Sequence, residues 1–192
     1  MAFPGRSAVD APRMSVPRSA EASREASFDR LFEEFSAPIY NYVLRMVGDR
    51  DRAADIAQDT FIKAYRKLDS LTDDAAARSW LYRIATNTAI DDMRRRRFLV
   101  RNDDEEQQAD RADHRPGPEQ QVMATQLDER LQRALLRLKP ERRQCLLLSD
   151  LEDMSAQQIG EVMGLSYGAV RTLLCRARGD MRRHLAAEGL TR

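Results

Sequence analysis

The feature that most constrains this fold is a polar break in the middle of the chain. Residues 98–126 contain an acidic run and the sequence Pro116-Gly117-Pro118, whereas apolar residues on both sides recur every three or four positions. That spacing places apolar side chains on one face of a helix, and no stretch shows the alternation typical of a strand. Proline and glycine interrupt helices, so the break is interpreted as a flexible linker. The sequence therefore predicts an all-α protein of two small helical domains on one linker.

The composition of the chain ends sets the other boundaries. Residues 1–26 are rich in Ala, Ser, Pro and Arg and hold few large apolar side chains, so we predict a disordered tail there. We expect an N-terminal domain of three or four helices over residues 27–97, a C-terminal domain of four helices over 127–186, and a short tail at 187–192. The expected helices lie at residues 28–47 (one helix, or a pair broken at Pro38), 51–68, 75–97, 127–138, 140–149, 155–163 and 166–184.

The overall composition excludes several classes of protein. The chain has 192 residues and a formal net charge of +1, so any binding to nucleic acid must come from a local basic patch. No apolar run approaches the ~18 residues that a membrane span needs. The N-terminus also lacks the apolar core of a secretory signal. We therefore expect a cytoplasmic protein without membrane insertion of its own.

Nothing in the sequence predicts an enzyme. It shows no nucleophile paired with a base, no cluster of metal ligands and no glycine-rich phosphate loop. His114 and His184 have no predicted partner, and Cys145 and Cys175 are too far apart in sequence for a metal or redox motif. We therefore predict no catalytic residue, no metal site, no cofactor and two reduced thiols.

The stretch Ser155–Arg183 has the pattern of a helix-turn-helix. Gly164 stands where the turn needs a positive φ, and Gly160 supplies the small residue where the two helices cross. Ser155 and Gln158 form a capping box for the first helix, and Ser166 can cap the second. The positions that should be buried are all apolar, namely Ile159, Met163, Leu165, Val170 and Leu173.

The second helix of this motif has two chemically different sides. One is predicted to carry Val170, Leu173, Leu174, Ala177, Met181 and Leu185, and the other Arg171, Thr172, Cys175, Arg176, Gly179, Arg182 and Arg183. An apolar back with an arginine-bearing front suits a helix in the major groove of DNA, where arginine contacts phosphates and guanine. The alternative is a solvated charged face on an ordinary helical hairpin.

The predicted helix over residues 51–68 also has two faces. Ala54, Ala57, Phe61, Ala64, Tyr65 and Leu68 form an apolar stripe. A second face carries Asp55, Gln58, Asp59 and Ile62 at helical spacing, and an exposed isoleucine among acids is typical of a surface that binds a basic helical partner. A plain amphipathic surface is the alternative.

The helix expected over residues 75–97 ends in four consecutive arginines. Leu81, Ala85, Ala89 and Met93 are expected to pack inward, whereas Arg83, Asn87, Asp91 and Arg94 line another face. The arginine run is either solvated or in contact with phosphate. Trp80 and Tyr82 either stack on unpaired bases or belong to the core, and the sequence does not decide between the two.

Together the segments resemble the extracytoplasmic-function (ECF) sigma factors of bacterial RNA polymerase. "DRAADIAQDTFIKAYRKL" is similar to the family's core-binding helix, and "RSWLYRIATNTAIDDMRRRR" to the helix that opens and reads the −10 promoter element. Residues 138–183 are similar to the domain that reads the −35 element. The resemblance implies a sigma region 2 domain at 27–97 and a region 4 domain at 127–186. It also implies a function, which is to bind core polymerase, direct it to −10/−35 promoters and help to melt the DNA.

The resemblance also implies roles for individual residues. Core polymerase would be bound through its β′ clamp helices by Asp55, Gln58, Asp59 and Ile62, and through its β flap by the second domain. The −10 element would be contacted by Ser70, Thr72, Trp80, Arg83, Asn87, Arg94 and Arg95, with the loop 69–74 capturing a flipped base. The −35 element would be read by Tyr167, Arg171, Thr172, Cys175, Arg176 and Arg178. An anti-sigma factor would be the regulatory partner.

The sequence also allows two alternative functions. The chain could be a stand-alone helix-turn-helix regulator whose N-terminal domain senses a ligand or a partner, or an adapter that binds only protein. The acidic face of residues 55–62 and the arginine run argue against the regulator, and the arginine front of the last helix argues against the adapter.

Overall fold

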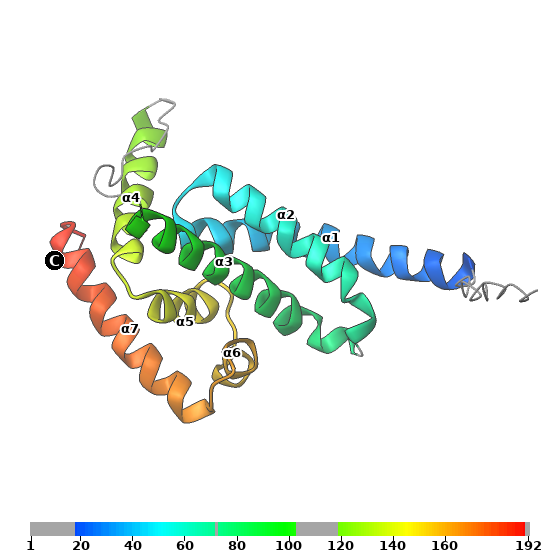
Figure 1. Cartoon of the computed structure of the whole chain (residues 1–192). Helices are drawn as coiled ribbons and strands as arrows, with labels where there is room; N and C mark the ends of the chain where they lie inside the picture. The colour runs from blue at the N-terminus through cyan, green and yellow to red at the C-terminus, as the bar shows by residue number, and fades with distance from the viewer. Residues whose placement is uncertain (1–17, 72, 103–118, 191–192) are drawn as a thin grey trace, which may run out of the picture.

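The computed structural model describes residues 18–71, 73–102 and 119–190, and every element in these ranges is helical (Figure 1). The elements are α1 (Arg18–Val47), α2 (Arg50–Arg66), η1 (Leu68–Ser70), η2 (Asp74–Ala76), α3 (Ala77–Asn102), α4 (Glu119–Leu136), α5 (Pro140–Asp150), α6 (Ala156–Met163) and α7 (Tyr167–Ala187). None of the helices in the described ranges is both long enough and apolar enough to cross a bilayer. The predicted all-α fold is confirmed.

Three of the predicted boundaries are wrong. α1 begins at Arg18, so residues 18–26 of the predicted tail are helical. It continues through Pro38 without a break, which is the single-helix alternative of the prediction. α3 runs on to Asn102 and α4 begins at Glu119, so both ends of the predicted linker are helical. Residues 103–118 of that linker lie outside the described residues.

Physical reasons account for these differences. The segment from Arg18 to Ser27 has no large apolar residue in its sequence but contains good helix formers, and extending an existing helix needs no new nucleation. Around Pro38, burial of Phe35, Ile39 and Tyr42 offsets the lost hydrogen bond, because packing rather than propensity supplies most helix stability in proteins.

Helices α1, α2 and α3 form the N-terminal unit. Tyr42 of α1 and Tyr82 of α3 are fully buried with ring centroids 5.3 Å apart, and the Tyr42 hydroxyl lies 2.8 Å from Thr86 Oγ1. Leu81, Ala85 and Ala89 are buried as predicted, and Met93 is partly buried. The stripe predicted for α2 is partly wrong, since Ala54 and Tyr65 are exposed, and the residues buried on α2 are Ala53, Ile56, Ala57, Thr60, Phe61 and Ala64.

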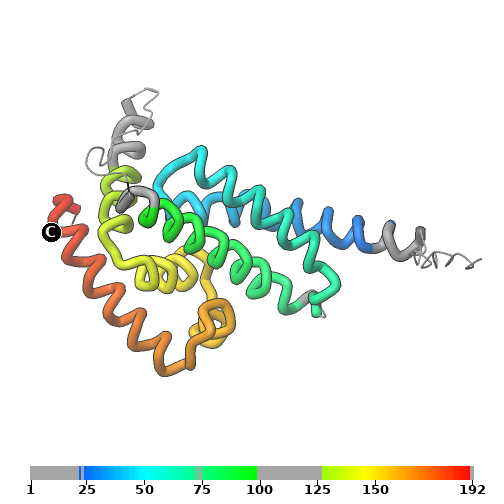
Figure 2. Tube along the Cα trace, in the orientation of Figure 1, coloured from blue at the N-terminus to red at the C-terminus, as the bar shows by residue number. Residues whose placement is uncertain are grey.

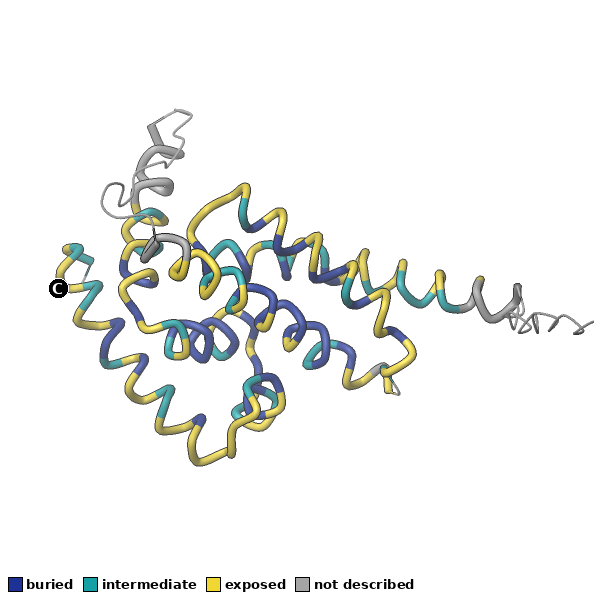
Figure 3. The backbone as a smooth tube through the Cα atoms, viewed as in Figure 1, coloured by how far each residue is buried: buried dark blue, intermediate teal, exposed yellow. Residues whose placement is uncertain are grey.

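Helices α4 to α7 form the C-terminal unit around α5. α5 starts with Pro140 in its first turn, where the missing N–H costs nothing, as the sequence predicts. Every residue from Arg143 to Leu148 is buried, which makes α5 the centre of this unit (Figure 3). Burial raises the pKa of the Cys145 thiol to about 11, so this thiol stays protonated at neutral pH.

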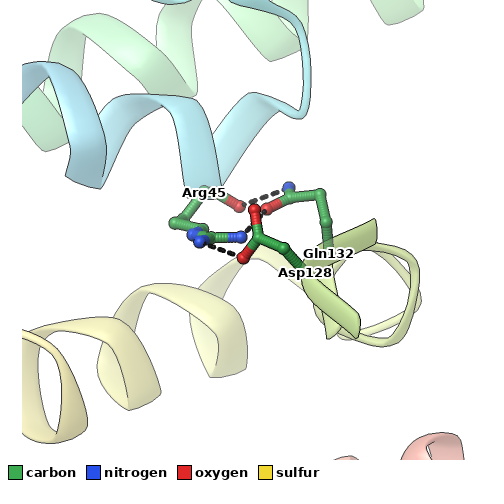
Figure 4. Close-up of polar contacts among 3 residues, drawn as sticks. All are labelled: Arg45, Asp128 and Gln132. Atoms are coloured by element: carbon green, nitrogen blue, oxygen red, sulfur yellow. Dashed lines mark hydrogen bonds and ion pairs between the residues drawn. The ribbon is translucent and has the colours of Figure 1, made fainter. Parts of the chain in front are cut away.

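The two units pack against each other (Figure 2). α3 contacts α6, and the C-terminal end of α1 contacts α4 and α5. Arg45 of α1 forms an ion pair with Asp128 of α4 and donates to Gln132 Oε1 at 3.3 Å, while Gln132 Nε2 donates to the Arg45 carbonyl at 3.2 Å (Figure 4). The Leu136 side chain lies over Gly48, where a Cβ atom would come within 2.6 Å of it.

A buried arginine joins the ends of two helices at this contact. Arg143 Nε donates to the Leu135 carbonyl at 2.9 Å, and its Nη2 donates to the carbonyls of Leu136 at 2.7 Å and Leu138 at 3.1 Å. Its Nη1 donates to the carbonyl of Met46 near the end of α1. The partial negative charge of helix C-termini favours a cation here. Burial lowers the pKa of Arg143 to about 10, so the guanidinium remains charged at neutral pH.

A second polar contact joins α3 to the turn before α6. The Tyr82 hydroxyl donates to the buried Glu152 carboxylate, and Arg78 Nη2 lies 3.5 Å from the same carboxylate. Burial, together with the hydrogen bond to Glu152, raises the pKa of Tyr82 far above its ordinary value. The phenol therefore stays a neutral donor to an acceptor that only the other unit supplies.

Candidate protein and nucleic-acid interfaces

The helix-turn-helix geometry predicted from the sequence is present. Gly164 has φ +68° and ψ 34°, a left-handed conformation that ends α6. Ser155 Oγ accepts from the Gln158 amide at 3.3 Å, and Gln158 Oε1 accepts from the Ser155 amide at 2.9 Å, which completes the capping box. Ser166 Oγ accepts from the Ala169 amide at the start of α7. Both ends of α6 and the start of α7 are therefore capped by residues close in sequence.

Gly160 is the crossing point of the two helices. It is buried, and a Cβ there would lie 2.6 Å from the carbonyl oxygen of Leu165. Of the five positions expected to be buried, Ile159 and Val170 are buried, and Met163 and Leu173 are partly buried. Leu165 is 38% exposed, contrary to prediction, because its backbone closes the turn while its side chain lies at the surface.

The two sides of α7 are separated as predicted. Val170, Ala177 and Met181 are buried, while Leu173, Leu174 and Leu185 are partly buried. The opposite side exposes Arg171, Thr172, Cys175, Arg176, Arg182 and Arg183, with Gly179 intermediate. Tyr167 is 59% exposed, and its ring centroid lies 5.8 Å from the Arg171 guanidinium. A cationic face with one aromatic residue is therefore open to solvent.

Arg178 of α7 makes contacts within the protein that Arg171 and Arg176 of the same helix do not make. Arg178 donates to Asp150 Oδ1 at 2.7 Å and to Ser149 Oγ at 3.2 Å, and the hydrogen bond to Asp150 raises its pKa. Arg178 thus braces α7 against α5. Within the described ranges neither Arg171 nor Arg176 takes part in an ion pair. These two guanidiniums can reach an external anion without breaking an internal bond.

A second exposed surface lies on α2. Asp55, Gln58, Asp59 and Ile62 are all exposed on one face, and Ile62 is 42% exposed. Beside it is an open hollow of about 580 Å³ lined by Gln58 and Ile62 together with aromatic rings of α1 and α2. These rings belong to Phe28, Phe32, Tyr40, Phe61 and Tyr65. The acidic face is therefore continuous with an apolar one.

The aromatic part of this surface was not predicted. The rings of Phe32 and Phe61 pack edge to face with centroids 4.9 Å apart, and those of Phe28 and Tyr65 at 5.0 Å. Phe32 nevertheless stays 47% exposed. The i, i+4 spacing of Phe28 and Phe32 is visible in the sequence, but it is equally typical of core residues.

A second hollow of about 550 Å³ opens between α4, α5 and α7. Its floor is apolar, with Leu131, Leu135, Leu146, Leu147, Met181 and Leu185, and its rim carries the exposed Leu151 together with Arg45, Asp150, Arg178 and Arg182. Arg45 comes from α1, so the hollow spans both units. It was missed because its lining comes from four helices that are distant in sequence.

The α3 surface agrees with the predicted separation of faces. Arg83, Asn87, Asp91 and Arg94 are exposed, as are Arg95, Arg96 and Arg97. Trp80 is only 8% exposed and its indole N–H donates to Ser70 Oγ at 3.3 Å, while Tyr82 is fully buried. For these two aromatics the structure shows the packing role, and a free face for stacking on a base is absent at both. Ser70 is exposed, and Thr72 lies outside the described residues.

Comparison with known proteins defines the class. Residues 31–98 match the family described as Sigma-70 region 2, and residues 128–181 match Sigma-70, region 4. The two matches coincide with the N-terminal and C-terminal units. The chain therefore has the domain pair of bacterial transcription initiation factors.

Proteins of similar sequence identify the group of sigma factors to which the chain belongs. RNA polymerase sigma factor YlaC of Bacillus subtilis is 33% identical over 162 residues, which cover 83% of this chain and 92% of YlaC. ECF RNA polymerase sigma factor SigW of B. subtilis is 30% identical, over 83% of this chain and 89% of SigW. ECF RNA polymerase sigma factor SigE of Mycolicibacterium smegmatis is 34% identical, but the match spans only 62% of its length. The chain belongs to the ECF RNA polymerase sigma factors.

Solved structures agree with this fold. CnrH in complex with the cytosolic domain of CnrY is 25% identical with a TM-score of 0.64, over 88% of this chain and 94% of that one. The sigma factor RpoE of Bartonella quintana, solved with the anti-sigma factor NepR, has a TM-score of 0.65 at 21% identity, over 83% and 97% of the two chains. Family membership decides against the stand-alone regulator and the adapter.

Proposed function

We propose that this chain binds core RNA polymerase through α2 and promoter DNA through α3 and α7, and so directs initiation to −10/−35 promoters. The observation that carries the proposal is the exposed face of α7, whose Arg171 and Arg176 are free of internal ion pairs in the described ranges. Family membership supports a role in transcription. The individual contacts rest on the surfaces described above.

Each surface has a proposed partner. The face of Asp55, Gln58, Asp59 and Ile62 binds the β′ clamp helices, and its apolar extension suits an amphipathic helical partner. The −35 element is read by Tyr167, Arg171, Thr172, Cys175 and Arg176, with Arg178 reaching DNA only if it leaves Asp150. The −10 element is contacted by Ser70, Arg83, Asn87, Arg94 and Arg95, and by the predicted Thr72.

The free chain is expected to bind promoters weakly. Opening about ten base pairs costs roughly 1.4 kcal/mol per step, or on the order of 14 kcal/mol. Flipping a base out of the stack costs a further few kcal/mol, which contacts in its pocket must offset. The net charge of +1 gives little general attraction to DNA. Core polymerase must therefore supply most of the free energy for melting. A gel shift in which the isolated chain opens a promoter tightly and specifically would contradict this.

Reconstituted run-off transcription tests the assignment. Adding the chain to core polymerase should restore initiation from defined start sites on genomic fragments of the source organism. Arg176→Ala should lower this transcription about fivefold or more, since a base or phosphate contact is worth ~1–3 kcal/mol, without changing affinity for core. Arg130→Ala removes the same charge from the exposed surface of α4 and serves as the control.

The complementary variant tests the other surface. Asp55→Ala combined with Gln58→Ala should weaken binding to core polymerase and leave the α7 surface intact. Each variant is then the control for the other, because both lower transcription but only one lowers core affinity. If both lost core binding equally, the assignment of the two surfaces would be wrong.

The hollow between α4, α5 and α7 is assigned to the polymerase β flap, and we expect an anti-sigma factor to cover it in the silent state. Its leucine floor and basic rim suit an amphipathic helix with acidic residues. CnrH, of similar fold, was solved with a protein partner, the cytosolic domain of CnrY. Leu151, 48% exposed at the rim, allows a test that spares the core. Leu151→Arg should reduce co-purification of both partners.

Two further expectations follow from family membership. The protein acts in the bacterial cytoplasm, where its polymerase and promoters are, and it has no catalytic activity of its own. Transcription restored by the chain should therefore depend on the catalytic residues of core polymerase alone.

A further inference from the structure

The first turns of α1 make a contact that lies outside the family match. The match to Sigma-70 region 2 begins at residue 31, whereas α1 begins at Arg18. Arg24 lies in these added turns and contacts the C-terminal end of α2. The start of α1 and the end of α2 lie on the same side of the molecule (Figure 1). Arg24 Nη2 donates to the Tyr65 carbonyl at 2.8 Å, and its guanidinium lies 5.1 Å from the centroid of the Tyr65 ring.

The same arginine also touches the segment that follows α2. Arg24 Nε lies 3.6 Å from Asp69 Oδ1, an ion pair with side chains 34% and 78% exposed. A cation is well placed here, because the last carbonyls of a helix lack intrahelical donors and carry partial negative charge. Arg24 thus ties the end of α2 and the first residues of η1 to α1.

The segment Leu68–Leu71 is braced from its other side by α3. The indole N–H of Trp80 donates to Ser70 Oγ at 3.3 Å, and the same hydroxyl donates to the Lys67 carbonyl at 2.6 Å. Leu68 is buried and Leu71 packs partly into the core. The segment therefore lies between two braces, and only the one from α1 comes from outside the region 2 match.

We propose that Arg24 is a positioning residue for the segment Leu68–Leu71, and that it sharpens the base preference of this chain in the −10 element. The inference rests on the proposed function, which places Ser70 against −10 DNA. A prearranged segment loses less conformational entropy on binding a base, and it discriminates better among bases because its groups cannot shift to accommodate the wrong one.

Arg24 is not needed to hold α1 and α2 together. These helices pack through Phe28 and Phe32 of α1, which follow Arg24 in the sequence, and Phe61 of α2. The Phe61 ring contacts both other rings. The Asp69 carboxylate in this ion pair is 78% exposed, and an ion pair with one solvated partner contributes little to stability. Removing the guanidinium should therefore loosen the segment without unfolding the unit.

The test is a base-preference profile measured on holoenzyme reconstituted from the full chain and core polymerase. Wild-type holoenzyme first identifies a promoter among genomic fragments. That promoter is then randomised separately over its −10 and −35 elements, and transcripts are sequenced. Arg24→Ala should lower the preference for the best base about three- to tenfold at one or two adjacent −10 positions. The −35 profile and the affinity for core should stay unchanged.

Three variants control for other causes. Arg30→Ala removes the same charge from the same helix, where the side chain donates to Ser27 Oγ at 3.4 Å and makes no polar contact with α2 or η1 among the described residues. It should leave the profile unchanged. Arg24→Lys keeps the charge but loses the planar fork that bonds Tyr65 and Asp69 together, so it should restore the preference only in part. Asp69→Asn should shift the same −10 positions as Arg24→Ala.

The outcomes separate the inference from the proposed function. The positioning role would be overturned if Arg24→Ala left the base-preference profile unchanged, or if it lowered transcription equally for every base at every randomised position. Either result would leave the sigma function in place. If wild-type chain restored no start-site-specific transcription, the proposed function and this inference would both fall. A selective loss at adjacent −10 positions, partly recovered by Arg24→Lys, supports the inference.

Discussion

The close contact at the helix-turn-helix crossing allows a quantitative prediction. A Cβ at Gly160 would lie 2.6 Å from the Leu165 carbonyl oxygen, whereas a Cβ at Gly179 would meet nothing within 4 Å. Both glycines are inside helices, and neither has positive φ. Alanine gains up to ~1 kcal/mol over glycine in a helix, and this gain is common to both sites. The difference between the two alanine variants therefore isolates the cost of the contact.

The contact cannot relax cheaply. The oxygen that must move is a backbone atom of the turn, and the Leu165 amide also donates to the Gly160 carbonyl at 3.0 Å. Overpacking of this kind costs ~1–3 kcal/mol. Gly179→Ala should therefore stabilise the protein by about 0.5–1 kcal/mol. Gly160→Ala should be less stable than Gly179→Ala by about 1–3 kcal/mol.

Urea unfolding followed by circular dichroism at 222 nm measures this difference on the full chain. With a slope of about 2 kcal/mol per molar urea, the midpoints of the two variants should differ by roughly 0.5–1.5 M. The midpoint of the wild-type protein shows whether each alanine substitution raises or lowers the stability. Equal midpoints, or a higher one for Gly160→Ala, would refute the claim that this crossing requires glycine.

Three further predictions concern buried and capping groups. Arg143→Met should lower the free energy of unfolding by about 2–4 kcal/mol in urea titrations, because it leaves buried carbonyls without a donor; a gain in stability would contradict this. At pH 8 a thiol reagent should modify Cys175 rapidly but Cys145 only in denaturant, since Cys145 is buried and its pKa is about 11. Ser155→Ala should cost about 1 kcal/mol through loss of the capping box, measured in the same titrations.

Features that depend on residues close in sequence were predictable. The capping box of Ser155 and Gln158, the left-handed Gly164 and the two sides of α7 follow from helix geometry alone, and all three are confirmed. The exposed face of Asp55 to Ile62 was predictable for the same reason. In each case the spacing of a few residues fixes which way the side chains point.

Features that depend on long-range contacts were not predictable. The burial of Arg143 is not visible in the sequence, because its acceptors come together only when the ends of α1 and α4 meet in the fold. Leu165 reads as buried from its apolar character, yet the turn geometry turns its side chain outward. The sequence of residues 18–26 has no apolar periodicity, so it does not predict the helix that continues through them. Residue type alone does not carry this information.

The bonding of Arg143 has a consequence for how freely the two units separate. Of the four carbonyls it contacts, three are at the end of α4 in its own unit, and only that of Met46 lies across the contact. When the units part, the guanidinium keeps most of its acceptors, and water can replace it at the end of α1. Separating the units would therefore break one hydrogen bond of Arg143, and its guanidinium would stay paired with carbonyls of its own unit.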